Sequence, residues 1–332
     1  MRSTIAKPIG ITATVPVEII LAAGMEPVDL NNLFISSELP ERLVAQAEAA
    51  GFSHGICAWI KGIYATVLNH HIKDVICVTG GDCSNTIALG ELLSRRGVRV
   101  ISFEYPLKRQ KEKLLSQMEN LAKALSTTWD EIALTKARLD RIRAKLKTLD
   151  RLTYDGNMVT GLENHLFLVA SSDFKGNPDR FEKEVDRFLD EAVKRKPGDD
   201  AIRLGYLGVP PIFSGFYERI ESMGARVVFN EVQRQFSMPF DEKDMVQQYL
   251  RYTYPYDMHG RLKDIQKEIQ NRRLDGLIHY TQTFCYRQIY DMILRENISL
   301  PILTLEGDRP GRIDSRTAVR IETFVEMLKD RI

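Results

Sequence analysis

The hydrophobic positions of the chain fall into short continuous apolar runs and longer stretches with helical spacing. Continuous runs such as Val75–Val78 and Val98–Phe103 are typical of strands that are buried on both faces of a parallel sheet. Helix patterns lie between these runs, and glycines such as Gly51 and Gly97 follow them as stop signals. The same alternation resumes after residue 200. Alternating strands and helices indicate parallel sheets covered by helices.

Outside residues 108–149, the pattern predicts seven strands and nine helices, together with a strand that ends near Ile56 and runs into one of these helices. The strands are expected over residues 26–30, 74–79, 98–103, 202–207, 226–229, 274–279 and 300–305. The helices are expected over residues 16–23, 41–50, 58–70, 84–95, 180–194, 213–223, 260–272, 286–296 and 315–331.

The region from Lys108 to Leu149 has a different character. It contains neither Gly nor Pro, and its apolar residues recur at helical spacing, so we expect two long helices that break near Ser126–Thr128, with Thr128 as a cap. Residues 196–200 are the best candidate linker. The predicted fold class is therefore α/β, with two Rossmann- or flavodoxin-like parallel-sheet lobes and an added helical segment. The expected domains are residues 1–165, including the extension over 108–150, and residues 166–332.

Composition narrows the class of protein. The 332 residues are 44% hydrophobic and 27% charged, with a formal net charge of +1. This balance argues against a disordered chain and against an electrostatic nucleic-acid binder. No run approaches the length of a membrane span, and Lys7 and Pro8 interrupt any signal-like apolar core at the N-terminus. We therefore expect a cytoplasmic protein that does not bind a membrane.

Four cysteines, at positions 57, 77, 83 and 285, are too few for a disulfide scaffold, and no CxxC motif occurs. Cys83 and Cys285 belong to an internal similarity. In both places an aspartate, a strand and a threonine precede the cysteine, and Glu104 and Glu306 follow the respective cysteines by 21 residues. A duplicated half-domain would produce this similarity, and so would chance resemblance between two βαβ units of common size.

The predicted position of three cysteines suggests chemistry. Cys57, Cys83 and Cys285 are each expected after a strand and before a helix, at the sheet edge where α/β proteins bind ligands. A helix N-terminus favours the thiolate, which is the form that binds metal. Three thiolates could hold an iron–sulfur cluster and leave one iron open for catalysis. Cys77 lies inside an apolar run and is expected to be a core residue.

Weaker signals leave other sites open. His54 and Cys57 could join Cys83 in a zinc site, and Cys285 could pair with His279 as a nucleophile. Gly205–Gly208 is an incomplete dinucleotide fingerprint. His70 and His71 are expected to be a solvated pair at a helix end. Arg234 is a candidate phosphate or carboxylate contact, although an ordinary surface arginine is the favoured interpretation.

Several segments taken in order resemble the 2-hydroxyacyl-CoA dehydratase D-component family, which also includes benzoyl-CoA reductase subunits and double-cubane cluster proteins. The resemblance covers nearly the whole chain and is strongest at its end. The segments are Val15–Val28, Cys57–Gly62, Thr79–Thr86, Asp275–Cys285, Ile302–Asp308 and Arg316–Leu328. One departure is that Asp82 precedes Cys83, whereas the family usually has a Cys-Asp pair.

The resemblance implies two α/β lobes with a [4Fe-4S] cluster in the cleft between them, held by Cys57, Cys83 and Cys285. It implies an acyl-CoA thioester substrate, a homologous or identical partner subunit, and an ATP-dependent iron–sulfur activator that supplies a low-potential electron. In the dehydratases, one-electron reduction of the thioester makes a ketyl radical that expels the leaving group. An anaerobic lyase or reductase subunit is therefore expected.

Three further possibilities remain at this stage. The chain could be an accessory electron-transfer subunit without a substrate pocket, or a double-cubane-type reductase subunit for a small molecule that is not a CoA ester. It could also be a cluster-free α/β binding module. Four cysteines suffice for a single cubane with one to spare, so a double cubane would require Cys77 as a ligand.

Overall fold

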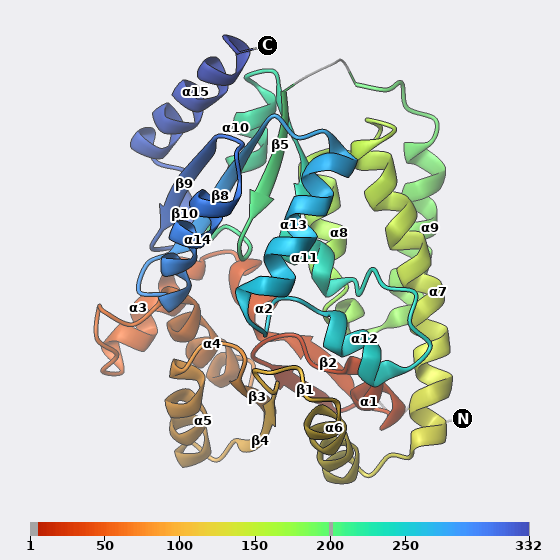
Figure 1. The fold of residues 1–332 in the computed structure, drawn as a ribbon. Coiled ribbons are helices and arrows are strands. Elements are labelled where there is room, and N and C mark those ends of the chain that lie inside the picture. Colours follow the sequence, from red (N-terminus) through yellow and green to blue (C-terminus); the bar gives the residue numbers. More distant parts are fainter. Residues whose placement is uncertain (1–5, 199–201, 332) are drawn as a thin grey trace. The chain divides into compact units, whose positions relative to one another are not determined.

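The computed structural model describes residues 6–198 and 202–331 and divides into two compact units (Figure 1). Unit 1 consists of Met1–Ala144, Ala170–Glu184 and Met238–Asp257, and unit 2 of Lys145–Val169, Val185–Ser237 and Met258–Ile332, as far as these ranges are described. These units are compact parts of the structure and not necessarily domains that fold by themselves. The domain boundary expected at residue 165 therefore stays a prediction. Residues 199–201 lie outside the described residues, so the linker prediction is covered only over 196–198.

Unit 1 contains a four-stranded parallel sheet with the order β2-β1-β3-β4. Its strands are β1 (Pro8–Ile11), β2 (Glu26–Asp29), β3 (Asp74–Gly80) and β4 (Arg99–Glu104). The helices between them are α1 (Val17–Ala22), α2 (Leu30–Ile35), α3 (Pro40–Ala49), α4 (Ala58–Asn69) and α5 (Asn85–Arg95). Strand β3 is central, and its first five residues are buried, as the apolar run predicts.

Unit 2 repeats this topology with the order β7-β5-β8-β9. Its strands are β5 (Ile202–Leu207), β7 (Ala225–Asn230), β8 (Gly276–Gln282) and β9 (Ile302–Gly307), and a small parallel pair joins β6 (Phe213–Ser214) to β10 (Gly311–Arg312). The helices are α10 (Phe216–Glu221), α11 (Glu231–Phe236), α13 (Met258–Arg272), α14 (Tyr290–Asn297) and α15 (Ser315–Lys329), with a 3-10 turn η2 (Tyr286–Ile289). The prediction of an α/β fold built on parallel sheets is confirmed.

The remaining helices are α6 (Lys111–Leu125), α7 (Trp129–Tyr154), α8 (Gly161–Ala170), α9 (Pro178–Ala192) and α12 (Met245–Arg251), with a 3-10 turn η1 (Phe174–Gly176). The predicted break between two long helices is confirmed at Ser126, whose φ is +58°. Thr128 and Glu131 form a capping box, in which Thr128 N donates to Glu131 Oε2 (2.8 Å) and Glu131 N donates to Thr128 Oγ1 (3.4 Å). Helix α7 begins in unit 1 and ends in unit 2.

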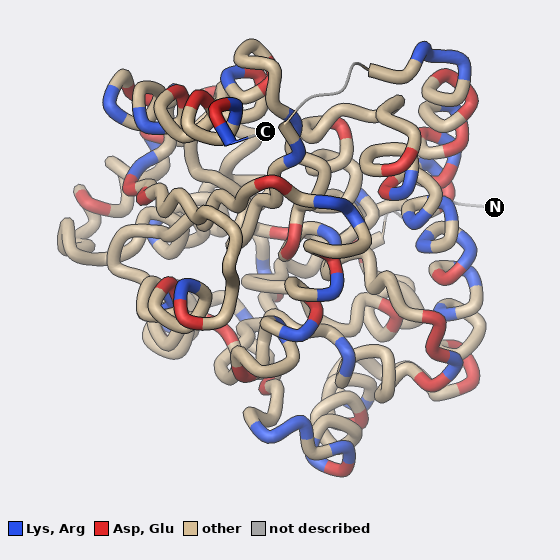
Figure 2. The backbone as a smooth tube through the Cα atoms, turned by 45° about the horizontal axis from the view of Figure 1, so that its top comes forward, with Lys and Arg blue, Asp and Glu red and all other residues tan. Residues whose placement is uncertain are grey.

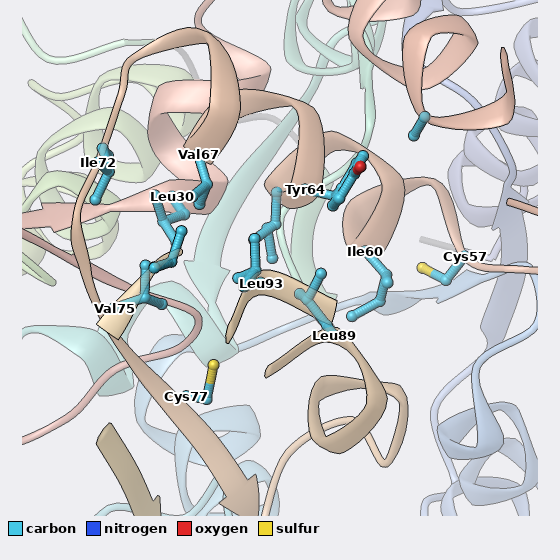
Figure 3. Close-up of a cluster of buried hydrophobic side chains, with 13 residues drawn as sticks. Leu30, Cys57, Ile60, Tyr64, Val67, Ile72, Val75, Cys77, Leu89 and Leu93 are labelled. Carbon is cyan, nitrogen blue, oxygen red and sulfur yellow. The ribbon is translucent and has the colours of Figure 1, made fainter. Parts of the chain in front are cut away.

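The core of unit 1 includes a cluster of buried side chains from α2, α3, α4, β3 and α5, shown in Figure 3. Two cysteines belong to it. Cys77 lies on β3, and Cys57 lies at the start of α4, where its sulfur occupies a different part of the cluster. Gly62 allows α4 to approach α2, because a Cβ at this position would lie 2.5 Å from ring carbons of the fully buried Phe34.

Some predicted elements differ from the structure. Residues 54–57 form turns and a loop rather than a strand, and α10 begins at Phe216 because Phe213 and Ser214 form β6. The helix expected over 286–296 starts as the 3-10 turn η2. Elements β1, α2, α8, β10, α11 and α12 were not predicted. Lys, Arg, Asp and Glu are interspersed along the described chain (Figure 2), and none of its helices is long and apolar enough to cross a membrane.

Candidate functional site

Cys83 lies in the loop between β3 and α5, as the sequence predicts. The strand ends at Gly80, and the helix begins at Asn85 after its N-cap, Ser84. Two contacts within unit 1 hold the loop: Tyr254 Oη donates to Asp82 Oδ1 (3.2 Å), and Gly81 packs so closely that an added Cβ would lie 2.7 Å from Pro255 O. Gly81 also has a φ of +89°, which glycine adopts without strain. The Cys83 thiol is therefore presented by a fixed turn at the carboxyl edge of the sheet.

Cys57 is the N-cap residue of α4, but the strand predicted before it does not exist. A turn over residues 53–56 precedes it, in which Ile56 N donates to Ser53 O (3.1 Å). The buried Lys61 supports this turn, because its Nζ donates to His54 O (3.2 Å) and to Glu48 Oε1 (2.8 Å) on α3. Cys57 is only 7% exposed. Its position at the start of a helix is thus confirmed, although the chain reaches it from α3 rather than from a strand.

Cys285 lies between β8 and η2 in unit 2. Its backbone N donates to Gln282 O (3.0 Å), and its carbonyl accepts from Gln288 N (3.2 Å). The preceding residue, Phe284, has a φ of +64°, an unusual backbone conformation for a residue with a large side chain. Such strained residues cluster at functional sites and cost about 1–3 kcal/mol each. The half-buried Cys285 thiol therefore follows a strained turn at the carboxyl edge of the second sheet.

The two sheet edges share more than a cysteine. Thr79 Oγ1 donates to Glu104 Oε1 (3.3 Å) at the end of β3 and β4, and Thr283 Oγ1 donates to Glu306 Oε1 (3.0 Å) at the end of β8 and β9. These glutamates are the ones that follow the cysteines by 21 residues. The identical strand order favours a duplicated half-domain over chance resemblance. The two threonines do not add to this, because Thr79 lies four residues before Cys83 and Thr283 lies two residues before Cys285.

Cys77 differs from the other three cysteines. It is fully buried within β3, and burial raises the pKa of its thiol to about 12. A thiol in such an apolar environment is disfavoured as a thiolate ligand. The prediction that Cys77 is a core residue is confirmed.

The structure also bears on the weaker candidates. The His54 ring is 83% exposed and its Nδ1 lies 3.3 Å from Glu48 Oε1, whereas the His279 ring is buried with its Nδ1 2.7 Å from Asp291 Oδ1. His70 and His71 are exposed at the end of α4, as expected. Arg234 is not a surface residue: it is 7% exposed, and its guanidinium pairs with Asp264 of α13. Its charge is thereby neutralised within the protein.

Within residues 6–198 and 202–331, no three His, Cys, Asp or Glu side chains form a preassembled metal site. Cys57 and Cys83 belong to unit 1 and Cys285 to unit 2. The donor chemistry of these three residues nonetheless fits a cluster, since iron–sulfur clusters are held by thiolates and each thiol lies at the start of a helical segment, which favours the thiolate form. Sequence reasoning missed the supporting residues Tyr254 and Phe284, which no local motif marks.

Two parallel sheets, each with a cysteine on a loop at its carboxyl edge, define an α/β protein. A sequence profile of the family described as 2-hydroxyglutaryl-CoA dehydratase, D-component, matches residues 12–328. The chain belongs to this family and is a component of a dehydratase-type enzyme. A comparison with curated proteins finds no match to the chain.

Proposed function

We propose that the chain is the iron–sulfur subunit of a 2-hydroxyacyl-CoA dehydratase-type system and that Cys57, Cys83 and Cys285 bind a [4Fe-4S] cluster. The observation that carries the proposal is the separation of the four cysteines into two kinds. Three lie at the beginnings of helical segments, and the fourth is buried within a strand. Membership of the dehydratase family supports the same assignment.

The residues of the chain have distinct roles in this proposal. A [4Fe-4S] cluster held by three thiolates supplies one iron that is open to substrate and a centre for one-electron transfer. Tyr254, through Asp82, fixes the turn that carries Cys83. Lys61 and Glu48 fix the turn that leads to Cys57. The strained Phe284 sets the direction of the chain into Cys285.

The proposal extends to partners and location. The substrate is an acyl-CoA thioester, the electron donor is an ATP-dependent iron–sulfur activator, and a homologous or identical subunit completes the enzyme. A cytoplasmic location follows, since such an activator requires ATP. The reaction is a dehydration if the substrate has a hydroxyl group that is expelled as water, and a reduction if it has no such leaving group.

The test is the iron and acid-labile sulfide content of protein purified without oxygen, for the wild type and four variants. We expect about four irons and four sulfides per chain in the wild type. Cys57→Ala, Cys83→Ala and Cys285→Ala should each lose most of the iron. Cys77→Ala is the matched control and should retain it, because this thiol is buried in β3.

The outcomes separate the alternatives. Full iron retention in one of the first three variants would remove that residue from the ligand set. Substantially more than four irons per chain would indicate a double cubane. A wild-type protein without iron after anaerobic reconstitution would refute the redox function and leave a cluster-free binding module. Iron without acyl-CoA binding would indicate an accessory electron carrier.

A further inference from the structure

A short buried helix in unit 2 carries an unusual number of polar side chains. Helix α11 follows directly from the carboxyl end of β7, and its first five residues, Glu231–Gln235, are all buried. Four of these five residues are polar, namely Glu231, Gln233, Arg234 and Gln235. Buried polar side chains require hydrogen-bond partners, so each of them calls for an explanation.

Three of the four have partners on α13. Arg261 donates to both carboxylate oxygens of Glu231, at 2.5 and 2.7 Å, and Asp264 accepts from Arg234 and from Gln235 Nε2, the latter at 3.0 Å. Glu231 Oε2 also accepts from Gly208 N (3.0 Å), which ties the start of α11 to the loop after β5. These contacts with α13 therefore hold the helix in one position and provide partners for Glu231, Arg234 and Gln235.

Gln233 is the exception. Its side chain is fully buried, and neither Nε2 nor Oε1 has a hydrogen-bond partner among the residues that the structure describes. Leaving one buried polar group unsatisfied costs about 1–3 kcal/mol, and here the donor and the acceptor of one amide are both unsatisfied. Arg234 Nε is also unbonded, but Gln233 is the polar side chain of this helix with neither of its polar atoms bonded.

We propose that Gln233 is a specificity-determining residue that hydrogen-bonds to the 2-hydroxyacyl group of the substrate. This inference rests on the proposed function, and its basis is the chemistry of the amide. A ligand group that satisfies both Nε2 and Oε1 must accept one hydrogen bond and donate another. An ionised carboxylate or a phosphate dianion only accepts, and an ammonium only donates.

A 2-hydroxyacyl thioester carries the required pair on adjacent carbon atoms. Its carbonyl oxygen accepts from Nε2 of Gln233, and its hydroxyl donates to Oε1. The amides of the CoA arm do not offer this pair, because a trans secondary amide directs its N–H and C=O to opposite sides. The adenine of CoA does offer it, so the test compares CoA esters that share the adenine and differ only in the hydroxyl. The position of α11 after β7 agrees with the rule that open α/β sheets bind ligands beyond the carboxyl ends of their strands.

The substitution Gln233→Met tests the proposal in the assembled enzyme purified without oxygen. Methionine has a similar length and lacks the amide, so the variant removes an unsatisfied buried group and should unfold at the same or a higher temperature than the wild type. Gln282→Met is the stability control, since Gln282 is also buried but its amide is satisfied by Tyr280 Oη (2.7 Å) and by Asp308 O (2.9 Å). This control should unfold at a lower temperature.

The decisive measurement is binding of matched probe pairs: lactoyl-CoA against propionyl-CoA, and 2-hydroxyglutaryl-CoA against glutaryl-CoA. The wild type should prefer the hydroxylated member of at least one pair by tenfold or more, because a site built to bond a hydroxyl rejects its absence. Gln233→Met should lose this preference through weaker binding of the hydroxylated member alone. In turnover, KM for the hydroxylated substrate should rise accordingly.

Each other result overturns the proposal in an identifiable way. Persistent preference in Gln233→Met means that another residue recognises the hydroxyl. Equal weakening for both members of a pair means that Gln233 does not distinguish the hydroxyl. No effect on any probe means that the amide is satisfied by a buried water only. If the wild type binds no CoA ester, the proposed function itself fails.

Discussion

The two sheets have the same strand order, but the helix that leads into the third strand differs sharply between them. In unit 1 this helix is α4, whose sequence is mainly apolar and whose buried side chains belong to the cluster around Tyr64. In unit 2 it is α13, whose buried Arg261, Glu268 and Arg272 form ion pairs. One topology thus carries an apolar helix at this position in one unit and a helix with buried ion pairs in the other, although both units contain apolar clusters and buried charges.

Under the proposed function, the difference between α4 and α13 relates to the groups that each unit contributes to the site. The apolar side chains of α4 belong to the cluster that includes Cys57 and packs against Cys83, whereas the ion pairs of α13 position α11 and its amide. An apolar environment suits a thiolate-bound cluster that must be shielded from water, and ion pairs suit a rigid recognition element. Under the proposed function, unit 1 supplies two of the three cluster ligands, and unit 2 supplies the third ligand together with the amide of Gln233.

The largest effect is expected when the buried ion pairs of α13 are broken. Arg272 is 2% exposed and donates to Asp150 Oδ2 (2.6 Å), Glu268 Oε2 (2.6 Å) and Val228 O (2.8 Å). Its positive charge holds the pKa of Asp150 below the usual value despite burial. Arg272→Met should lower the free energy of unfolding by about 3–5 kcal/mol, because it leaves two carboxylates without their partner.

The comparison becomes sharper with Lys61→Met, which removes the buried charge from α4. Glu48, the carboxylate partner of Lys61, is 16% exposed and can be hydrated, so a loss of about 1–2 kcal/mol is expected. Urea unfolding of both variants gives the two values. Equal losses would contradict the distinction between the two helices.

The next effect concerns the close packing of α4 against Phe34 in unit 1. Gly62→Ala places a methyl group against the buried ring of Phe34 and should cost about 1–3 kcal/mol. Gly205→Ala in β5 is the counterpart, since its nearest neighbours are the ends of the Leu277 and Leu274 side chains, which can adjust. It should cost less than about 1.5 kcal/mol. Thermal unfolding of the two variants measures the difference, and a costlier Gly205→Ala would contradict it.

The last contrast is a pair of opposing pH dependences, one in each unit, whose effects partly cancel in the wild type. In unit 1, burial and the neighbouring Asp29 carboxylate raise the pKa of Asp173 to about 7. The folded state then binds more protons than the unfolded state, so the free energy of unfolding falls between pH 4 and 7. In unit 2, burial lowers the pKa of His165 to about 4, so the free energy of unfolding rises between pH 4 and 6.5.

Each of these contributions amounts to at most about 1.4 kcal/mol per pH unit, and in the wild type they oppose each other. Asp173→Asn should therefore leave a free energy of unfolding that rises with pH in this window, and His165→Phe should leave one that falls. Urea unfolding at pH 4.5, 5.5 and 6.5 tests both signs. Parallel curves for the two variants would be the contradictory result.

Most of the sheet architecture could be predicted from the sequence because strands buried on both faces leave continuous apolar runs. Strand β1 was missed because it has only four residues and includes Pro8 and Gly10, which both disfavour strands. The strand expected before Cys57 was wrong because residues 53–56 turn instead, and Gly55 within them marks such a turn.

The site was predictable only in part. The positions of Cys83 and Cys285 followed from strand and helix patterns, and Cys77 was recognised as core by its apolar neighbours. The environment of Arg234 and Gln233 could not be predicted, because the sequence of α11 is mostly polar, as is typical of an exposed segment. Its burial depends on charges of α13 that lie about 30 residues further along the chain. Local patterns do not show which distant charges will pair.

The interleaved order of the two units has a consequence for biosynthesis. Unit 1 includes Met238–Asp257, with Tyr249, whose hydroxyl donates to the buried Glu18 (2.8 Å), and Tyr254, which holds the Cys83 turn. These residues leave the ribosome long after Cys57 and Cys83, so unit 1 waits for most of the chain to be translated before it can be completed, although the strands of its sheet end at Glu104. Insertion of a cofactor during synthesis would therefore occur late, and a nascent chain released before residue 238 would expose two cysteines on an unfinished core.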